Sequence, residues 1–433
     1  MANTYISRTH SGTATDTKKI TYSAWLKFGT DDATEAILVE WLDGNHRVEF
    51  LRLNTGEIRF EWVDGGSNSA YFKTKRKFKD VNGWFHFVFT LDTTLATAGD
   101  RIKLYINGVR ETEFDSSYGT MNPALNKACR MNENGKTVYM GQRGNSAQYW
   151  TGSMSHIHFV DGTAYQADTF GSTDSTTGEW KINTSPTVTY GNHGWFILKN
   201  GNSVTDQSGN GNNCTASGTL TKTEDNPSNV FATLNPLVPY NGALAYTKGN
   251  TVIAYSGSGA DSWGTRWGVS TLGMSSGKYY AEAKVAAIGT NQMYALGVAK
   301  DVGTFTPSSS VGSEGVGYYS TGGIFNYTNQ TQTVATYTTN DIIGLAFDAT
   351  NGTAQWYKNG SAIGNAETGL STDGTWFFVS NFYSSGKVAV NYGNGYFEET
   401  AVSSAGTNAS NIGIFEYDVP SGYTALSTKG LNE

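Results

Sequence analysis

The sequence predicts an all-β protein, with two antiparallel β-sandwiches in tandem. Glycine is abundant (52 residues), proline is scarce (7), aromatic residues reach 13% and charged residues only 15%. Thr, Ser and Asn fill the gaps between short apolar runs, which is typical of strands and turns rather than helices. No convincing amphipathic helical pattern interrupts these runs.

A repeated phrase divides the chain into two parts. Residues 84–110 read WFHFVFTLDTTLATAGDRIKLYINGVR: two apolar-alternating runs separated by a polar loop and closed by Asn107-Gly108. Residues 341–360 read DIIGLAFDATNGTAQWYKNG and close with Asn359-Gly360. Asn-Gly tolerates the positive φ angles of a two-residue hairpin turn, so each phrase predicts a β-meander. A length of 433 residues accommodates two domains of about 200 residues.

Further strands are expected around the first meander, because short apolar-alternating runs are separated by turn-forming Asp, Asn and Gly. The polar residues 1–20 are expected to begin as an extended arm. The predicted strands are 20–28, 36–41, 47–53, 57–63, 137–141 and 153–160. Stacking two antiparallel sheets buries one face of every such strand, so a sandwich is the economical arrangement.

The charge balance argues against a nucleic-acid partner. The formal net charge is -7 and the pI is about 5.5, whereas nucleic-acid binders usually carry a basic stripe. The basic run at residues 73–79 alternates with Phe72, Thr74 and Phe78. This alternation indicates an edge strand that its charges protect from pairing.

Neither cysteine usage nor hydropathy indicates a secreted or membrane-spanning chain. Cys129 and Cys214 are the only cysteines, so a disulfide framework is excluded, although one bridge stays open. The N-terminal residues contain no apolar signal region, and no window approaches the roughly 20 apolar residues that span a bilayer. We therefore expect a protein that is made and stays in the cytosol, or leaves by lysis, with no membrane insertion.

The first half resembles a known family. The pattern GWFHFVFTLD followed by RIKLYINGV, together with SMSHIHFVDGTAYQADTF, resembles the laminin-G/concanavalin A-like jelly rolls. The resemblance implies that residues 1–200 form one such sandwich. The continuation, FGSTDSTTGEWKI, YGNHGWFIL, DQSGNGNNCTASG and DNPSNVFATLNPL, resembles virion proteins of tailed phages.

The second half resembles a related sandwich. Residues 201–240 are rich in Asn, Gly, Ser and Thr, which predicts a connector. After it, GKYYAEAKVAAI, LGVA and the YKNG hairpin resemble the SPRY/B30.2 family. The resemblance implies a second concanavalin-like sandwich over residues 241–433, with strands near 243–255 and in MYALGVAK, EGVGYYS and TWFFVSNFY.

The catalytic string of a β-glucanase is not found. A β-glucanase of this fold would place carboxylates at E-x-D-x-x-E spacing on one strand face, and no such string occurs. The pairs Glu57/Glu61 and Glu111/Glu113 do not match this spacing, and solvent-face carboxylates explain them better. No P-loop is present, since GMSSGK is one residue short of the P-loop spacing.

Two features resemble metal-binding patterns. His156 and His158 share one face of a predicted strand, but without a third ligand they are better explained as surface histidines. Asp206 and Asn210 have the oxygen spacing of a calcium loop without its final Glu, and a turn explains them as well. Laminin-G relatives often hold calcium between rim loops, so the resemblance leaves a Ca²⁺ site at Asp206 and Asn210 open. No cofactor is otherwise required.

Ligand recognition is expected in loops that combine aromatic and polar residues, because sugars present apolar faces edged by hydroxyls. Core packing is the alternative explanation for many of these rings. The candidate binding residues are Trp41, Asp43, His46, Arg47, Arg143, Tyr149, Trp150, Trp263, Arg266, Trp267, Tyr319 and Tyr327.

The resemblances imply a non-enzymatic phage virion protein, a tail fibre or tail-tip adhesin that binds host surface glycan. It would be assembled in the bacterial host cytoplasm, contact other virion proteins and, like many such appendages, form a homotrimer. A capsid fibre or decoration protein is the close alternative. A glycan-degrading enzyme of concanavalin-like fold and a secreted lectin are the alternatives of other classes.

Overall fold

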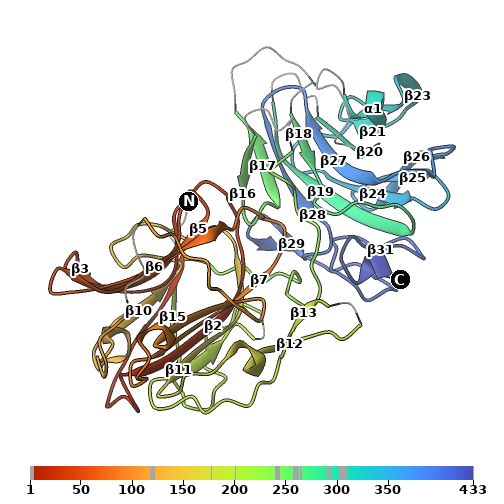
Figure 1. Ribbon diagram of the computed structural model, residues 1–433. Helices are drawn as coiled ribbons and strands as arrows, with labels where there is room; N and C mark the ends of the chain where they lie inside the picture. Colours follow the sequence, from red (N-terminus) through yellow and green to blue (C-terminus); the bar gives the residue numbers. More distant parts are fainter. Residues whose placement is uncertain are drawn as a thin grey trace. The chain divides into compact units, whose positions relative to one another are not determined.

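The computed structural model describes residues 4–117, 122–176, 178–199, 201–238, 244–256, 263, 266–289, 294–301 and 310–432. The chain divides into two compact units, Met1–Lys222 and Thr223–Glu433 (Figure 1). Strands dominate both. Within the described residues, α-helix is limited to α1 (Val311–Glu314), with short 3-10 turns η1 (Ala98–Asp100), η2 (Arg130–Asn132), η3 (Ala167–Thr169) and η4 (Gly430–Asn432). The predicted all-β class is confirmed.

The first unit is a sandwich of a seven-stranded and a six-stranded antiparallel sheet. The seven-stranded sheet runs in the order β15 (Thr215–Ser217), β1 (Tyr5–Thr9), β10 (Thr137–Met140), β3 (Glu35–Asp43), β4 (His46–Arg52), β5 (Glu57–Asp64), β6 (Ser67–Lys77). The six-stranded sheet runs β14 (Trp195–Ile197), β11 (Ser153–Asp161), β2 (Lys19–Lys27), β7 (Phe85–Asp92), β8 (Ile102–Ile106), β9 (Val109–Arg110). A small hairpin, β12 (Gly171–Thr173) with β13 (Trp180–Ile182), follows.

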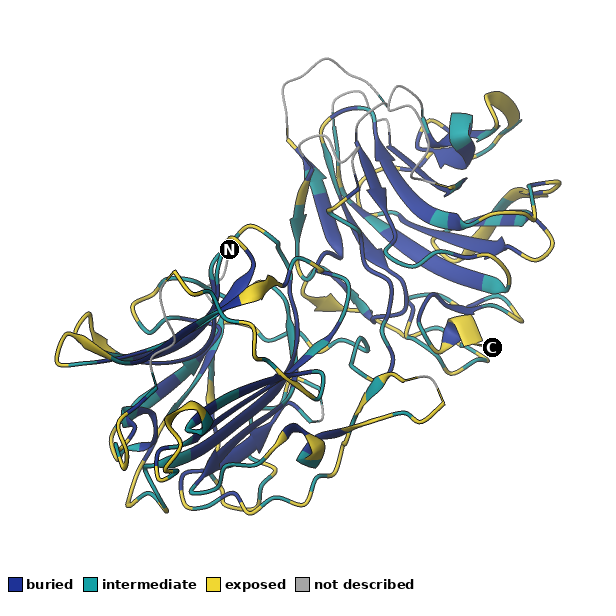
Figure 2. Ribbon diagram, viewed as in Figure 1, coloured by how far each residue is buried: buried dark blue, intermediate teal, exposed yellow. Residues whose placement is uncertain are grey.

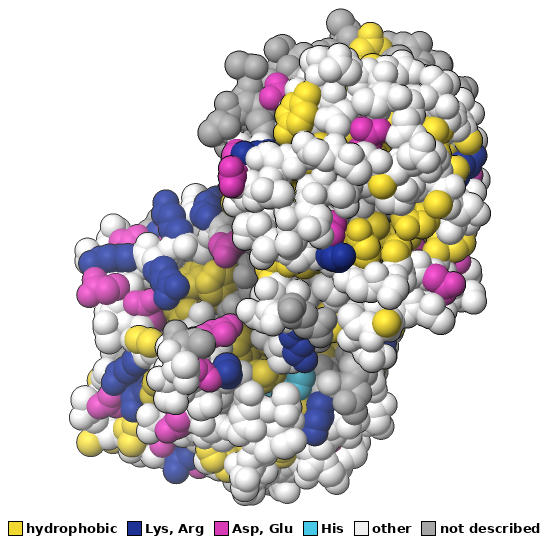
Figure 3. Space-filling model, turned by 90° about the vertical axis from the view of Figure 1, so that its right-hand side faces the viewer, with side chains coloured by type: hydrophobic (Ala, Val, Ile, Leu, Met, Phe, Trp, Pro, Cys, Tyr) yellow, Lys and Arg dark blue, Asp and Glu magenta, His cyan; other side chains and the backbone are white. Residues whose placement is uncertain are grey.

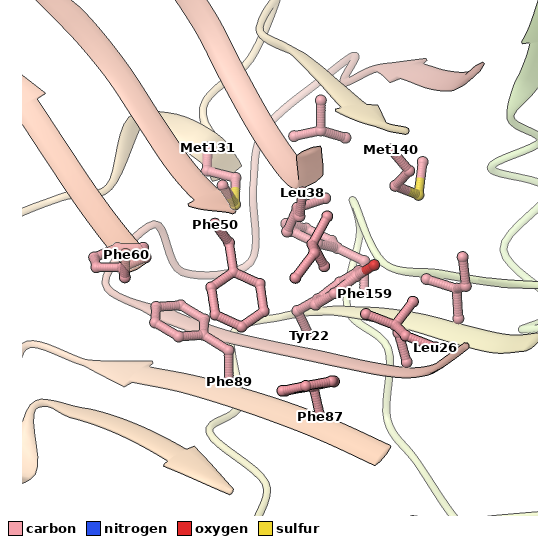
Figure 4. Close-up of a cluster of buried hydrophobic side chains, with 14 of the residues drawn as sticks. Tyr22, Leu26, Leu38, Phe50, Phe60, Phe87, Phe89, Met131, Met140 and Phe159 are labelled. Atoms are coloured by element: carbon pink, nitrogen blue, oxygen red, sulfur yellow. The ribbon is translucent and has the colours of Figure 1, made fainter. Parts of the chain in front are cut away.

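Alternation builds the core of this unit. Inward residues of both sheets meet, so that Phe50 of β4 lies 5.9 Å, between ring centroids, from Phe89 of β7, and Phe60 of β5 lies 4.6 Å from the same ring. Figure 4 shows these rings with Tyr22, Leu26, Leu38 and Phe159 converging between the strands. Aromatic side chains bury large areas, so they dominate the energetics of such a core.

Two segments of the chain differ from the sequence prediction. The expected N-terminal arm contains β1, which pairs with both β10 and β15 and buries Ile6. The expected connector is not a free linker either: β15 completes the first sheet, whereas Phe231 and Leu234 are buried in the second unit. The unit boundary at Lys222 falls inside the predicted connector.

The charged strand β6 does lie at a sheet edge, as predicted. Its outer side is partly covered, because the amide of Lys75 donates to the carbonyl of Glu113 and the amide of Asp115 donates to the carbonyl of Lys73. The side chains of the same residues form ion pairs, Lys75 with Glu113 at 3.0 Å and Lys73 with Asp115 at 2.8 Å. The basic run is therefore matched by an acidic segment rather than only by solvent.

The second unit is a second sandwich with its own core. Its larger sheet runs β16 (Ala245–Thr247), β17 (Val252–Tyr255), β28 (Gly386–Asn391), β19 (Lys278–Ile288), β24 (Ile342–Asp348), β25 (Thr353–Lys358), β26 (Ser361–Glu367), and β31 (Thr424–Ala425) pairs with β19. The six-stranded sheet runs β18 (Trp267–Val269), β27 (Trp376–Phe382), β20 (Tyr294–Lys300), β21 (Gly315–Tyr319), β22 (Gly323–Asn326), β23 (Asn329–Thr333). A small hairpin joins β29 (Tyr396–Phe397) and β30 (Thr400–Ala401). Figure 2 shows buried strand interiors, with exposed residues gathered at loops and at edge strands such as β23.

Both predicted Asn-Gly hairpins are confirmed and have the same construction. Asn107 and Gly108 have φ angles of 47° and 80°, and Asn359 and Gly360 have φ angles of 49° and 82°. In each case the asparagine side-chain oxygen accepts a hydrogen bond at 2.8 Å from a backbone amide of the strand that pairs with the hairpin's first strand: His86 of β7 for Asn107, and Ile342 of β24 for Asn359. The side chain thus extends the ladder by one rung, which explains why asparagine precedes glycine in both turns.

Candidate functional site: an arginine cluster on the outer sheet face

Charged side chains converge on the outer face of the seven-stranded sheet. On β4, Val48 and Phe50 point into the core, so the residues that alternate with them face outward. Register places Glu49 directly opposite Glu61 of β5, and Trp41 of β3 opposite Arg47. We call the following six residues the arginine cluster. They are Trp41, Arg47, Glu49, Arg59, Glu61 and Arg143.

Glu49 lies at the centre of the cluster and is fully buried. Its carboxylate accepts hydrogen bonds from Arg143 through Nε and through Nη2 at 3.2 Å, from Arg59 Nη2 at 3.3 Å and from Arg47 Nε at 3.2 Å. A buried carboxylate is costly unless it is paired in this way. The three guanidinium groups therefore compensate one buried charge.

Glu61 and the Trp41 indole ring also contact these guanidinium groups. Glu61 lies 3.2 Å from Arg47 Nη2 and 3.5 Å from Arg59 Nη2. The guanidinium carbon of Arg143 lies 4.3 Å from the centroid of the Trp41 ring, and that of Arg47 lies 5.8 Å from it. Stacking on an indole and pairing with carboxylates together restrict the arginine rotamers.

Arg143 reaches the sheet face because its loop passes close to Trp41. Gly144 has a φ angle of 89°, and a Cβ atom at this position would lie 2.7 Å from the Cβ of Trp41 and 3.2 Å from the ring of Tyr139. The amide of Arg143 donates to the carbonyl of Ala147 at 3.0 Å, which closes the loop. Glycine at 144 thus meets both the backbone conformation and the close approach.

The cluster lies in a unit whose charges balance. Residues 1–222 contain 22 Lys and Arg and 22 Asp and Glu, whereas residues 223–433 contain 8 and 15, so the formal net charge of -7 belongs to the second unit. In Figure 3, charged side chains of both signs are intermixed over one face of the first unit, and the second unit shows mainly uncharged surface. An anionic ligand would meet less repulsion at the first unit.

The structure brings together only some of the predicted binding residues of the first unit. Trp41, Arg47 and Arg143 meet in the cluster. Asp43 and His46 lie at the tip of the β3–β4 hairpin, where Asp43 Oδ1 lies 3.1 Å from His46 Nδ1 and accepts the amide of Asn45. The remaining two, Tyr149 and Trp150, are half-buried in the following loop, and Trp150 packs on the core beside Phe28.

Sequence reasoning missed three members of the cluster, Glu49, Arg59 and Glu61. Period-2 alternation within the two predicted strands was the available signal, because it places Arg47 with Glu49, and Arg59 with Glu61, on one face. Glu57, expected on the solvent face, is instead buried, and it accepts a hydrogen bond from Thr55.

The predicted residues of the second unit mostly pack within it. Trp267 and Tyr319 are buried, and Trp263 packs edge-on against Tyr319 at 5.0 Å. The Arg266 guanidinium donates to the carbonyl of Tyr383 and lies 3.9 Å from the Tyr255 ring centroid. Tyr327 alone among these predicted residues is exposed, at 42%.

The side chains of the candidate calcium site, Asp206 and Asn210, already have hydrogen-bond partners. Asp206 accepts the amides of Phe196, Ser208 and Asn212 and the Ser208 hydroxyl, at 2.8–2.9 Å. Asn210 donates to two backbone carbonyls, those of Gly191 and Gly194. A cation at this turn would have to compete with all of these donors. Among the described residues, no group of three His, Cys, Asp or Glu is placed to hold a metal ion.

The two histidines of β11 are not surface residues of a regular strand, as the sequence suggested. His158 is buried, stacks on Phe196 at 3.9 Å and bonds the Tyr190 hydroxyl at 2.8 Å. His156 has a φ angle of 46° at a β-bulge and is partly buried. Burial lowers the pKa of both imidazoles, that of His156 to about 4. The segment 165–190 covers this face of the sheet, and that cover could not be predicted from the strand pattern.

The second unit has a shallow pocket of about 350 Å³. Its lining residues are Ser320, Thr321, Thr336, Tyr337, Thr338 and Lys358. The Lys358 ammonium donates to the Thr336 carbonyl at 2.8 Å and pairs with Asp341 at 3.2 Å. The pocket is therefore rich in hydroxyl groups, and Asp341 neutralises the charge of Lys358.

Comparison with known proteins supports the fold of the first unit. Residues 2–169 match a laminin-G family model described as the concanavalin A-like lectin/glucanases superfamily, which confirms the predicted resemblance over that range. A comparison with curated proteins found no match. In the described part of the chain, no helix has the length and hydropathy to cross a bilayer.

Solved structures that resemble the chain include SPRY domains and a pentraxin. The SPRY domain of human HERC1 is 21% identical with a TM-score of 0.31, covering 36% of this chain and 96% of that one. A human SPRY domain is 18% identical with a TM-score of 0.26, covering 34% and 93%. The heptameric SAP-like pentraxin from Limulus polyphemus is 16% identical with a TM-score of 0.30, covering 46% and 89%. Each is a resemblance in fold alone.

Proposed function

We propose that this chain is a structural protein of a tailed-phage virion, a tail fibre or tail-tip adhesin that binds host surface glycan. The observation that carries the proposal is the arginine cluster, in which charged groups from two strands and one loop are fixed on an open sheet face beside the Trp41 ring of a third strand. Arg47, Arg59 and Arg143 each keep 15–23% of the side chain exposed. Partly exposed donors held in fixed positions suit recognition of a polar ligand.

The proposal makes the protein a binder rather than a glycan hydrolase. Hydrolysis needs one carboxylic acid that can donate a proton and a second carboxylate beside the scissile bond. Glu49 is fully buried and hydrogen-bonded to three guanidiniums, so it is not free to act as an acid or a nucleophile. Glu61 is paired as well, with Arg47 at 3.2 Å and Arg59 at 3.5 Å. This pairing favours fixed recognition over proton transfer.

The proposal also covers the site of assembly, the protein partners and the oligomeric state. The particle would be assembled in the bacterial host cytoplasm, and the chain would contact other virion proteins, as a homotrimer in such an appendage. These statements rest on the sequence resemblance. A place on the capsid, as a fibre or decoration protein, is the outcome that would replace the tail assignment.

Two measurements test the proposal. The full chain is applied to an array of bacterial surface glycans, and reducing-sugar release is measured in parallel on every glycan that binds. Binding without sugar release is expected; release that disappears in Glu61→Gln would overturn the non-enzymatic assignment. Cryo-electron microscopy of whole particles should place the chain at the tail, and density on the head would move it to the capsid.

A further inference from the structure

We propose that the arginine cluster recognises an acidic group, a carboxylate, sulfate or phosphate carried by the glycan. This inference rests on the proposed glycan-binding function and names its ligand class. The sequence suggested that Trp41 would stack on a sugar face. In the structure two guanidiniums lie beside that ring, at 4.3 Å and 5.8 Å from its centroid. Trp41 is therefore a platform for arginines, and the N–H groups of those arginines are the contact points.

The hydrogen bonds inside the cluster do not use all of the guanidinium N–H donors. Each guanidinium has five N–H groups and no acceptor. Among the described residues, the Nη1 groups of Arg59 and Arg143 contact no acceptor. Arg59 Nε is buried without a hydrogen-bond partner, so this guanidinium is under-satisfied. Planar guanidiniums with free N–H groups match the oxygen geometry of carboxylate, sulfate and phosphate.

The charge of the cluster favours an anion. Three guanidiniums face two carboxylates, which leaves one positive charge in surplus. The neighbouring charges on the same sheet face do not remove it, because Lys73 is paired with Asp115 and the Asp43 carboxylate caps its own hairpin turn beside His46. The second unit has a formal charge of -7 and contains a single arginine, Arg266.

Glu49 gives the cluster its rigidity. Because this carboxylate is buried, its pairing with the arginines is screened less by solvent than a surface ion pair would be. Arg143 binds it with two nitrogens, a geometry that fixes the guanidinium plane. A ligand would thus meet arginines that are already ordered, which reduces the entropy lost on binding.

The test uses the full chain and three oligosaccharides of matched length: oligogalacturonate, which carries carboxylates; sulfated dextran; and neutral dextran. Binding is measured by calorimetry at low and moderate salt. We expect the wild type to bind one or both acidic probes, more weakly as salt rises, and to bind neutral dextran at least tenfold more weakly. The better acidic probe distinguishes carboxylate from sulfate.

The test variant is Arg59→Gln, because Arg47 and Arg143 still pair with Glu49 in this variant. We expect it to lose about tenfold in affinity for the acidic probe. The matched control is Arg110→Gln, an exposed arginine of β9 paired with Asp100, and it should stay within twofold of the wild type. Thermal unfolding of both variants checks that the fold is retained.

Two outcomes would overturn the inference. Unchanged acidic-probe binding in Arg59→Gln would place the acidic site elsewhere. Equal binding of neutral dextran would show that charge is not what the site recognises, while the proposed glycan-binding function would still stand. Failure of the glycan array as a whole would instead remove the proposed function and this inference together.

Discussion

The hairpin glycine Gly108 allows a sharp test of how the first unit is held together. Its φ angle is 80°, and a Cβ atom there would lie 2.3 Å from Cζ3 of the Trp180 ring. The Trp180 indole donates to His86 Nδ1 at 3.0 Å, so His86 Nε2 carries the proton that bonds the Ser23 hydroxyl at 2.9 Å. Substitution by alanine therefore strains the turn and displaces an indole that a buried histidine holds.

The two costs can be estimated separately. An alanine at positive φ costs about 1–2 kcal/mol. Displacing Trp180 leaves the buried His86 nitrogen without a donor, which costs a further 1–3 kcal/mol or so. We expect Gly108→Ala to destabilise the first unit by about 2–5 kcal/mol. Gly65→Ala is the matched control, because Gly65 has a φ angle of 61° and nothing within 4 Å of its added Cβ. It should cost about 1–2 kcal/mol.

Peptide-resolved hydrogen exchange is the appropriate assay, since fluorescence-detected unfolding would mix signals from both units. Protection of the amides in β7 and β8 reports the opening free energy of the first unit alone. In a Trp180→Ala background, Gly108→Ala should cost only as much as Gly65→Ala. Equal costs of the two glycine substitutions in the wild-type background would refute the proposed docking of Trp180, as would an undiminished cost of Gly108→Ala without the indole.

Three further predictions concern buried groups. Burial raises the pKa of Glu282 to about 7, above the unfolded value of 4.5. The contribution of this raised pKa to the free energy of unfolding is therefore complete below pH 4.5 and is lost as the pH rises through 7. Glu282→Gln should flatten this loss, about 3 kcal/mol, in urea unfolding between pH 5 and 8, and parallel curves would contradict it. Burial raises the pKa of the free Cys129 and Cys214 thiols to about 12, so iodoacetamide should label neither at pH 8 without denaturant; native labelling would disprove this. Asn359→Ala should destabilise the β25–β26 hairpin by about 1–2 kcal/mol through loss of the hydrogen bond from Ile342 of β24. Asn359→Gly should destabilise it by less, as hydrogen exchange would show; the reverse order would be inconsistent with the turn geometry.

Most of the fold could be predicted because its signals are local. Apolar alternation marked β2 to β5, β7 and β8, and the Asn-Gly pairs marked both hairpins with the correct residues. Features that depend on a distant partner were missed. The segment that forms β1 contains few apolar residues, and only pairing with β10 and β15 makes it a strand. Near the C-terminus, β31 forms only by pairing with β19, and Leu426 beside it is buried.

The candidate site was predicted only in part, for a related reason. Trp41, Arg47 and Arg143 were chosen as aromatic and polar residues of loops, without regard to sheet register. Glu49 and Glu61 meet because β4 and β5 pair residue for residue, and this register cannot be read from either strand alone. The burial of Glu49 could not be predicted from the strand pattern either, because it depends on Arg143, which lies in a loop about ninety positions later in the sequence.

The location of the cluster on strands has a consequence for recognition. Side chains on a hydrogen-bonded sheet are held more rigidly than those on loops, and here a buried carboxylate additionally orients the arginines. Tolerance to substitution should therefore be low within the cluster and higher at the exposed tip of the β3–β4 hairpin, where Leu42 is 59% exposed and makes no part of the charge network. An adhesin built in this way would keep one acidic group as a fixed anchor, and variation of the surrounding hairpin tip and loops would adjust which glycans carry that group into contact.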